Sequence, residues 1–211
     1  MQAILAKCQY IVKGIYETFD ASHDFAHIER VRKNAEEILK TEPSANAGKV
    51  MLAVLLHDID DAKYKSDANP SAKEILQSLG VEAELTNQVL ACIESVSFSG
   101  GNAKNITSIE GSIVRDADRL DAIGAIGIAR TFAFGGARGR KLYDADEHTR
   151  ENMSEEEYRS KNTASVTHFY EKLLLLKDLM VTNEGKRIAE ERHTFMCAFL
   201  EQLDREIGMN C

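Results

Sequence analysis

Apolar residues recur at helical spacing along almost the whole chain. Between Ile4 and Phe19 they fall at positions i, i+3, i+4 and i+7, which together form one face of an α-helix. Proline, which breaks helix interiors, occurs only twice in the 211 residues, at Pro43 and Pro70. Alternating β-branched runs, which mark strands, are scarce. The sequence therefore predicts an all-α protein.

Capping signals and breaks set the bounds of the expected helices. Asn69 followed by Pro70 predicts an N-cap and a first helical residue, and Gly80 predicts the left-handed residue that ends this helix. The pattern Ser-x-x-Glu at 154–157 predicts a capping box that opens a long helix towards Met180. Residues 20–22 and Ser44 offer N-caps for the second and third helices. Further helices are expected over residues 82–97, 108–134 and 183–207.

The segment from Ala117 to Ala129 is unusual for a helix because it contains two glycines and four alanines. A glycine inside a helix costs roughly 1 kcal/mol relative to alanine. We expect another backbone to pack closely against a central helix here, which would explain the small residues. The alternative is a helix that breaks near Gly124.

The charge balance excludes a broad class of partners. The chain has 26 basic and 34 acidic residues, a net charge of −8, so a nucleic-acid polymer is not an expected partner. Its longest apolar runs, such as 173–176, are far short of the ~20 residues that span a bilayer, and no signal peptide is recognised, so no membrane partner is expected. The four cysteines are scattered without a CxxC pair, which favours reduced thiols and a cytoplasmic location.

Three clusters of polar residues interrupt the predicted apolar faces, at 23–31, 57–61 and 116–121. The second cluster begins with His57-Asp58, directly after the apolar run 54–56. A buried carboxylate without a partner costs several kcal/mol. A divalent cation would satisfy such carboxylates and the imidazoles together. Taken singly, each histidine could instead be a hydrogen-bonded structural residue.

The pattern formed by His27, His57-Asp58 and Asp118 resembles the HD superfamily of metal-dependent phosphohydrolases. The segments HDFAHIERV, LLHDIDDAKY, DADRLDAIGAIGIARTF and YEKLLLLKDLM, in this order, resemble a small bacterial branch of single-domain members, from about Ser22 to about Leu203. The resemblance implies one domain over residues 1–211, with an HD core at about 22–135 and C-terminal helices at about 154–207 packed on it. It also implies a compact helical bundle with a metal ion at its centre.

The resemblance assigns roles to individual residues. His27, His57, Asp58 and Asp118 match the four ligands of one divalent ion, which would be Mn²⁺, Mg²⁺, Co²⁺, Ni²⁺, Fe²⁺ or Zn²⁺. Asp116 and Asp121 remain alternatives to Asp118. Asp61, one helical turn after His57, matches an acidic position near the attacking water and is expected to act as general acid or base. Its alternative role is that of a solvated acid.

Several basic residues could contact a substrate phosphate. Lys63, His23 and Arg30 lie near the expected ligands in the sequence, although Arg30 could instead pair with a ligand carboxylate and His23 could serve only as a helix-entry residue. Arg138 and Arg140 lie in a glycine-rich basic stretch within 135–148, which we expect to be a mobile loop that contacts phosphate, or an ordinary surface turn. His148, His168 and His193 are not expected to be ligands.

The expected function is metal-dependent hydrolysis of a small phosphorylated metabolite, with a nucleotide as the leading substrate. Either a phosphomonoester or a nucleoside triphosphate, with release of pyrophosphate, would fit. No histidine occurs between Asp58 and Asp118, whereas dinuclear HD proteins add histidines there, so one metal ion is expected. The alternatives are a metal- or nucleotide-binding signalling module without turnover and a di-iron oxygenase. A homo-oligomer is compatible with the sequence.

Overall fold

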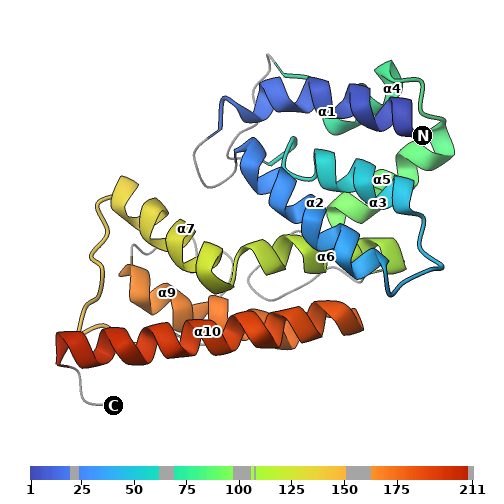
Figure 1. Ribbon diagram of the computed structural model, residues 1–211. Helices are drawn as coiled ribbons and strands as arrows, with labels where there is room; N and C mark the ends of the chain where they lie inside the picture. Colours follow the sequence, from blue (N-terminus) through green and yellow to red (C-terminus); the bar gives the residue numbers. More distant parts are fainter. Residues whose placement is uncertain (20–23, 62–68, 97–105, 107, 151–162, 209–211) are drawn as a thin grey trace. The chain divides into compact units, whose positions relative to one another are not determined.

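The structure is a computed structural model that describes residues 1–19, 24–61, 69–96, 106, 108–150 and 163–208 (Figure 1). Within these ranges every regular element is a helix and none is a strand, which confirms the all-α prediction. In chain order the elements are α1 (Gln2–Tyr16), α2 (Phe25–Leu39), α3 (Ala47–Leu56), α4 (Ala72–Ser78), α5 (Ala83–Glu94), α6 (Ile109–Asp121), α7 (Gly124–Ala137), α9 (Ser165–Glu171), the 3₁₀-helix η1 (Leu173–Leu179) and α10 (Asn183–Ile207).

The chain forms two compact units, and the division falls within α6, after Asp118. The first unit comprises Met1–Phe98 and Asn102–Asp118. Its centre is α3, which contacts α1, α2 and α5. This helix has buried residues on every side, including Leu52, Val54 and Leu56, because its sequence is apolar almost throughout. The expectation of a single domain stays a prediction.

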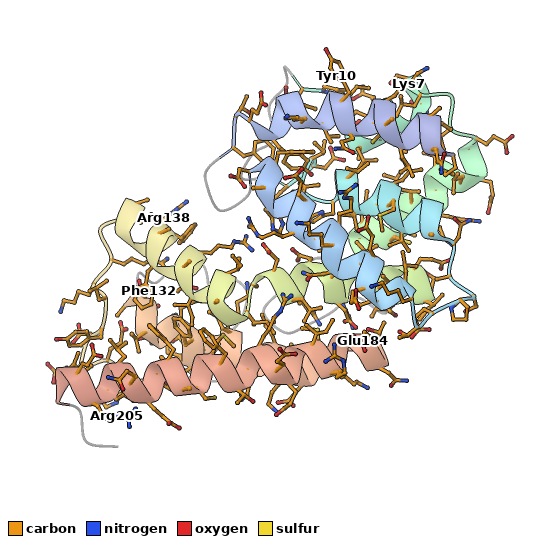
Figure 2. All side chains as sticks on the ribbon, viewed as in Figure 1. Lys7, Tyr10, Phe132, Arg138, Glu184 and Arg205 are labelled. Atoms are coloured by element: carbon orange, nitrogen blue, oxygen red, sulfur yellow. The ribbon has the colours of Figure 1, made fainter. Side chains whose placement is uncertain are left out.

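The second unit contains residues 119–211 and is built around α10, which contacts α7 and η1. Three aromatic rings lie close together in this unit: the ring of the buried Phe169 lies 6.0 Å from that of Phe132, which Figure 2 labels, and 6.1 Å from that of Phe199. Thr182 begins α10 by accepting a hydrogen bond from the backbone N–H of Gly185, and Gly208 ends it at φ +72°. The predicted bounds of this last helix, 183–207, are confirmed.

The predicted continuous helix over 108–134 is wrong, and the broken alternative is right. The helix α6 ends at Asp121, and α7 begins separately at Gly124. Gly124 has φ +75°, which favours glycine, and a Cβ on Gly127 would lie 2.2 Å from the carbonyl oxygen of Ala122. The small residues therefore do allow two backbone segments to lie close together, but these segments are the two sides of the break and not two packed helices.

A second prediction fails in the C-terminal half. The sequence predicts one long helix that continues through residues 163–180, but these residues form α9 and then η1, because Lys172 leaves the helical region at φ −142° and ψ −59°. The predicted capping box at Ser154 lies outside the described residues. Smaller differences concern caps: Asn46 caps α3 in place of Ser44, and Ser71 caps α4 with a capping box to Glu74. The left-handed glycine at Gly80 is confirmed.

Among the described residues, no single helix has the length and apolar character needed to cross a membrane; only α6 and α7 taken together pass that test, as a bent pair.

Candidate metal centre

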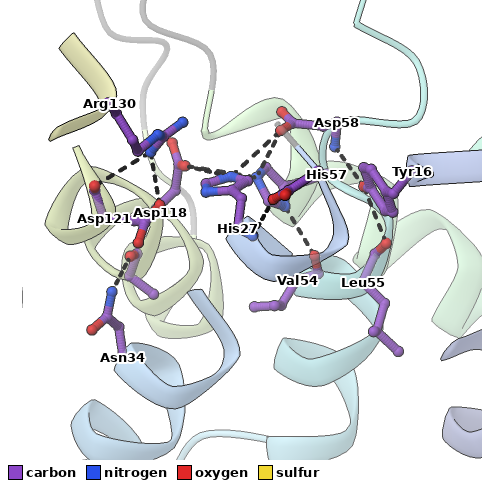
Figure 3. Close-up of polar contacts among 12 residues, drawn as sticks. Tyr16, His27, Asn34, Val54, Leu55, His57, Asp58, Asp118, Asp121 and Arg130 are labelled. Atoms are coloured by element: carbon purple, nitrogen blue, oxygen red, sulfur yellow. Dashed lines mark hydrogen bonds and ion pairs between the residues drawn. The ribbon is translucent and has the colours of Figure 1, made fainter. Parts of the chain in front are cut away.

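His27 lies in the first turn of α2. The Asp24 side chain caps this helix by accepting a hydrogen bond from the His27 backbone N–H at 3.0 Å, and the His27 side chain is buried. Two turns later on the same face, Asn34 donates a hydrogen bond to the carbonyl oxygen of Ala117 at 2.9 Å. Ala117 immediately precedes Asp118 on α6, so this bond holds the two helices with His27 and Asp118 near one another (Figure 3).

The C-terminal end of α3 places His57 and Asp58. His57 is the C-cap of this helix, and its ring Nδ1 lies 2.9 Å from the carbonyl oxygen of Val54. Because a carbonyl can only accept, Nδ1 carries the proton in this bond, and Nε2 is the nitrogen available to a metal ion. The chain then turns, and two backbone hydrogen bonds span three residues each: the N–H of Ile59 donates to Leu56, and the N–H of Asp61 donates to Asp58.

Four side chains from these elements bring their ligand atoms together in the first unit (Figure 3). The Nε2 atoms of His27 and His57 are 3.3 Å apart. Asp58 Oδ2 lies 3.5 Å from each of these nitrogens. Asp118 Oδ1 lies 3.5 Å from the nitrogen of His27 and 3.7 Å from that of His57. We call these four residues the HD cluster.

The spacing within the HD cluster fits a single ion. Donor atoms about 2.1 Å from one metal ion lie about 3.0 to 3.5 Å from each other. His27, His57 and Asp118 alone form a group that could hold a metal, and the buried Oδ2 of Asp58 lies at the same spacing. Two imidazole nitrogens with carboxylate oxygens suit first-row divalent ions.

Opposite charges in the HD cluster stabilise one another. Burial lowers the pKa of His57, but the carboxylates of Asp58 and Asp118 outweigh it and raise the pKa of His57 to about 9. Burial raises the pKa of Asp118, but the hydrogen bond and charge of His57, with the charge of His27, lower it below its usual value. A proton thus neutralises part of the cluster, and a bound cation would displace it.

The structure also bears on the two alternatives to Asp118. Asp121 is buried, and its carboxylate accepts a hydrogen bond from Arg130 at 2.7 Å within the second unit. Asp116 is fully buried and is not part of the HD cluster. Asp118 is the aspartate of this segment whose carboxylate meets both imidazoles.

The structure describes two of the four predicted catalytic and substrate-binding residues of the first unit, Asp61 and Arg30. Asp61 is half-buried on the turn that follows the HD cluster, three residues after Asp58. Its neighbour Asp60 accepts a hydrogen bond from the Ala72 N–H at 3.1 Å, which ties this turn to the start of α4. Arg30 is half-buried on α2, one turn after His27. His23 and Lys63 lie outside the described residues. The roles of all four stay predictions.

Arg138 and Arg140 lie in the second unit, just after α7. The guanidinium carbon of Arg138 is 3.5 Å from the ring centroid of Phe134, and that of Arg140 is 5.4 Å from it. The sequence predicts a loop from residue 135, but the loop begins only after Ala137, because α7 continues to that residue.

The residues that follow these arginines form hydrogen bonds with α9. The backbone N–H groups of Ser165 and Val166 each donate to a carbonyl of this segment, those of Lys141 and Leu142, at 3.0 Å. Near its end, Arg150 pairs with the buried Glu171 at 2.7 Å. These contacts connect Lys141, Leu142 and Arg150 to α9, and both interpretations of the stretch, a mobile loop that contacts phosphate or a surface turn, stay predictions.

His168, on α9, lies among positive charges. Burial, together with the charges of Lys172 and Arg140, lowers the pKa of His168 to about 3. The second unit therefore gathers cationic side chains around a neutral imidazole, in a chain whose net charge is −8.

Two residues that support the HD cluster were missed by sequence reasoning. Asn34 lies seven residues after His27, on the same helix face, and a polar residue in that otherwise apolar stripe was the available signal. Tyr16 is fully buried at the end of α1, and its hydroxyl donates to the carbonyl of Leu55 at 3.2 Å. Burial and the charge of Asp58 raise the pKa of Tyr16 well above its usual value, so this hydroxyl stays protonated.

Comparison with known proteins agrees with this geometry. The family model of the HD domain matches residues 24–123, a range that contains the whole HD cluster. YpgQ of Bacillus subtilis is 39% identical over 201 residues, which are 93% of this chain and 90% of that protein.

Solved structures extend the likeness to the whole chain. The structure of Bacillus subtilis YpgQ in complex with ADP has a TM-score of 0.78 and 34% identity, and covers 97% of this chain and 95% of that one. An HD-superfamily hydrolase of Bacillus thuringiensis has a TM-score of 0.76 and 41% identity, with 99% of both chains covered. A Lactobacillus plantarum protein has a TM-score of 0.86 and 35% identity, and covers 100% of this chain and 99% of that one. This chain belongs to the HD domain family.

Proposed function

We propose that this protein is a metal-dependent phosphohydrolase that acts on a nucleotide or a similar small phosphorylated metabolite. The observation that carries the proposal is the HD cluster, in which the two imidazole nitrogens lie 3.3 Å apart and each carboxylate oxygen lies 3.5 to 3.7 Å from both nitrogens. Family membership supports it, because solved relatives include HD-superfamily hydrolases.

In this proposal His27, His57, Asp58 and Asp118 hold one divalent ion. The two carboxylates balance its charge, and the bond from His57 Nδ1 to Val54 keeps the other ring nitrogen directed at the site. When bound, such an ion polarises a phosphoryl oxygen and lowers the pKa of a water molecule. Asp61 would take a proton from the attacking water or give one to the leaving group.

A nucleotide is the proposed substrate class because YpgQ, a relative at 39% identity, has been crystallised with ADP. Hydrolysis of a phosphomonoester and release of pyrophosphate from a nucleoside triphosphate both suit the proposed chemistry. We further propose that His23, Arg30 and Lys63, together with Arg138 and Arg140, contact substrate phosphates. Guanidinium groups bind phosphate oxygens through paired hydrogen bonds.

The direct test incubates the purified full-length chain with Mn²⁺, Mg²⁺, Co²⁺ or Ni²⁺ and a panel of nucleoside mono-, di- and triphosphates. Phosphate and pyrophosphate release are measured separately, which identifies the bond that is cleaved. We expect Asp58→Asn and His57→Ala to abolish turnover. Asp60→Asn is the matched control, because Asp60 lies on the same turn but bonds to Ala72.

Three results would replace this proposal. Turnover that Asp58→Asn leaves undiminished would show that the HD cluster is not the reactive site. Tight nucleotide binding without product, even at high protein concentration, would indicate a binding module. Close to two iron ions per chain would indicate a di-iron oxygenase.

A further inference from the structure

The backbone that carries Asp58 is fixed by a residue from a different helix. Tyr16, the last residue of α1, is 0% exposed, and its hydroxyl lies between two backbone groups of the α3 end. It donates to the carbonyl oxygen of Leu55 at 3.2 Å, and it accepts from the N–H of Asp58 at 3.4 Å (Figure 3). One hydroxyl therefore connects the last turn of α3 to a residue of the HD cluster.

This connection substitutes for a turn of helix. If α3 continued, the Asp58 N–H would donate to Val54 and the Leu55 carbonyl would accept from residue 59. In the structure the Val54 carbonyl accepts from His57 Nδ1, and the residue 59 N–H donates to Leu56. The Tyr16 hydroxyl supplies the acceptor and the donor that this change of pattern removes from Asp58 and Leu55.

The tyrosine ring is itself firmly held. It packs edge-to-face on Phe19, with ring centroids 5.1 Å apart, and lies 6.5 Å from the ring of Phe25. A phenylalanine would fill the same volume, so packing alone does not account for the hydroxyl. A buried hydroxyl group is costly unless it is hydrogen-bonded, and here both of its bonds go to the segment that bears the HD pair.

We propose that Tyr16 is a positioning residue of the metal centre, whose hydroxyl fixes the Asp58 backbone so that Oδ2 faces both imidazoles. This inference rests on the proposed metal site. If it holds, α1, which precedes the 24–123 segment matched by the family model, contributes a residue that supports the metal site. Tyr16 would not touch substrate or metal, and it would act only through Asp58.

The test measures Mn²⁺ binding to the metal-free full-length protein and the visible spectrum of its Co²⁺ form. Outer partners of metal ligands commonly change affinity by about 10- to 100-fold, so we expect Tyr16→Phe to weaken Mn²⁺ binding by about tenfold or more. We also expect the Co²⁺ spectrum to change, because Asp58 is displaced. Tyr10→Phe, on the same helix but 85% exposed, should leave both unchanged (Figure 2).

A second control separates positioning from simple destabilisation. Val12→Ala removes two methyl groups from the buried face of α1 but keeps the Tyr16 hydroxyl, so it should lower stability but leave Mn²⁺ affinity and the Co²⁺ spectrum as in the wild type. If Tyr16→Phe behaves like Val12→Ala, the positioning role is wrong although the metal site stands. If the wild type binds no metal, the proposed function itself fails.

A measurement on the wild type covers the case in which Tyr16→Phe does not fold. Hydrogen exchange of the metal-free protein reports the Asp58 amide directly. The inference expects this amide to be protected, since its acceptor is a buried hydroxyl. Exchange as fast as that of an open turn would overturn the inference.

Discussion

Acidification should destabilise this protein through one histidine of the second unit. The pKa of His168 is lowered from 6.5 to about 3 by burial and by the nearby charges of Lys172 and Arg140. The unfolded chain therefore takes up a proton below about pH 6.5, whereas the folded chain does so only near pH 3. Because the unfolded state binds more protons in this window, the stability that His168 contributes is complete above pH 6.5 and is lost as the pH falls towards 3.

The size of the loss follows from these two values. Between pH 7 and pH 5 the difference in proton uptake lowers the free energy of unfolding by about 2 kcal/mol. A folded pKa anywhere below about 4 gives nearly the same loss at pH 5, since the folded imidazole is then still neutral. Because the ring is half-buried, solvent screening reduces the effect, and we expect a loss of about 1 to 2 kcal/mol.

The assay is urea unfolding followed by circular dichroism at pH 7 and pH 5, for the wild type and His168→Gln. His57 and the carboxylates titrate alike in both proteins, so the difference between them isolates His168. We expect His168→Gln to escape the 1 to 2 kcal/mol loss. His148→Gln, which removes an exposed histidine of the same unit, should follow the wild type. Equal losses in the wild type and His168→Gln would refute the argument that burial, with the charges of Lys172 and Arg140, keeps this imidazole neutral.

Three further predictions concern the break, the ligand support and the metal. Gly127→Ala should destabilise the protein, because its Cβ would meet the Ala122 backbone. Gly136→Ala, on the same helix with open space around it, should be neutral or stabilising by up to about 1 kcal/mol, and thermal unfolding compares the two variants. Asn34→Leu should cost about 0.5 to 1.5 kcal/mol in urea unfolding and weaken Mn²⁺ binding in a titration, because it removes the buried hydrogen bond that connects α2 to the Ala117 carbonyl next to Asp118. Mn²⁺ at 100 times its dissociation constant should raise the free energy of unfolding of the wild type by about 2.7 kcal/mol, and His57→Ala should lose this gain; an equal gain in both would place the ion elsewhere.

The fold class and most helix positions were predictable because the periodicity is local. The break at Gly124 was not, since glycine and alanine suit both close packing and a broken helix, and only the position of the Ala122 carbonyl decides between them. The apolar run 173–176 gave no means of distinguishing an α-helix from the 3₁₀ turn that it forms.

The HD cluster was predictable for a different reason. Histidine and aspartate are rare on apolar faces, so the three polar clusters could be recognised in the sequence. The choice of His27, His57-Asp58 and Asp118 within them came from the resemblance to the HD superfamily, and the structure brings these four residues together. Tyr16 and Asn34 could not be recognised in the same way. An aromatic residue in an apolar stripe looks like ordinary core, and their hydrogen-bond partners lie 39 and 83 residues away in the chain.

The end of α6, after Asp118, is held by hydrogen bonds of the second unit. The three residues after Asp118 are each hydrogen-bonded within the second unit: Arg119 donates to Leu179, the Leu120 carbonyl accepts from Arg192, and Asp121 accepts from Arg130. The last carbonyls of a helix have no partner within it. Guanidinium groups at that end also interact favourably with the negative end of the helix dipole. These bonds therefore stabilise the last residues of α6, those after Asp118, through partners in the second unit that lie as far along the chain as Arg192.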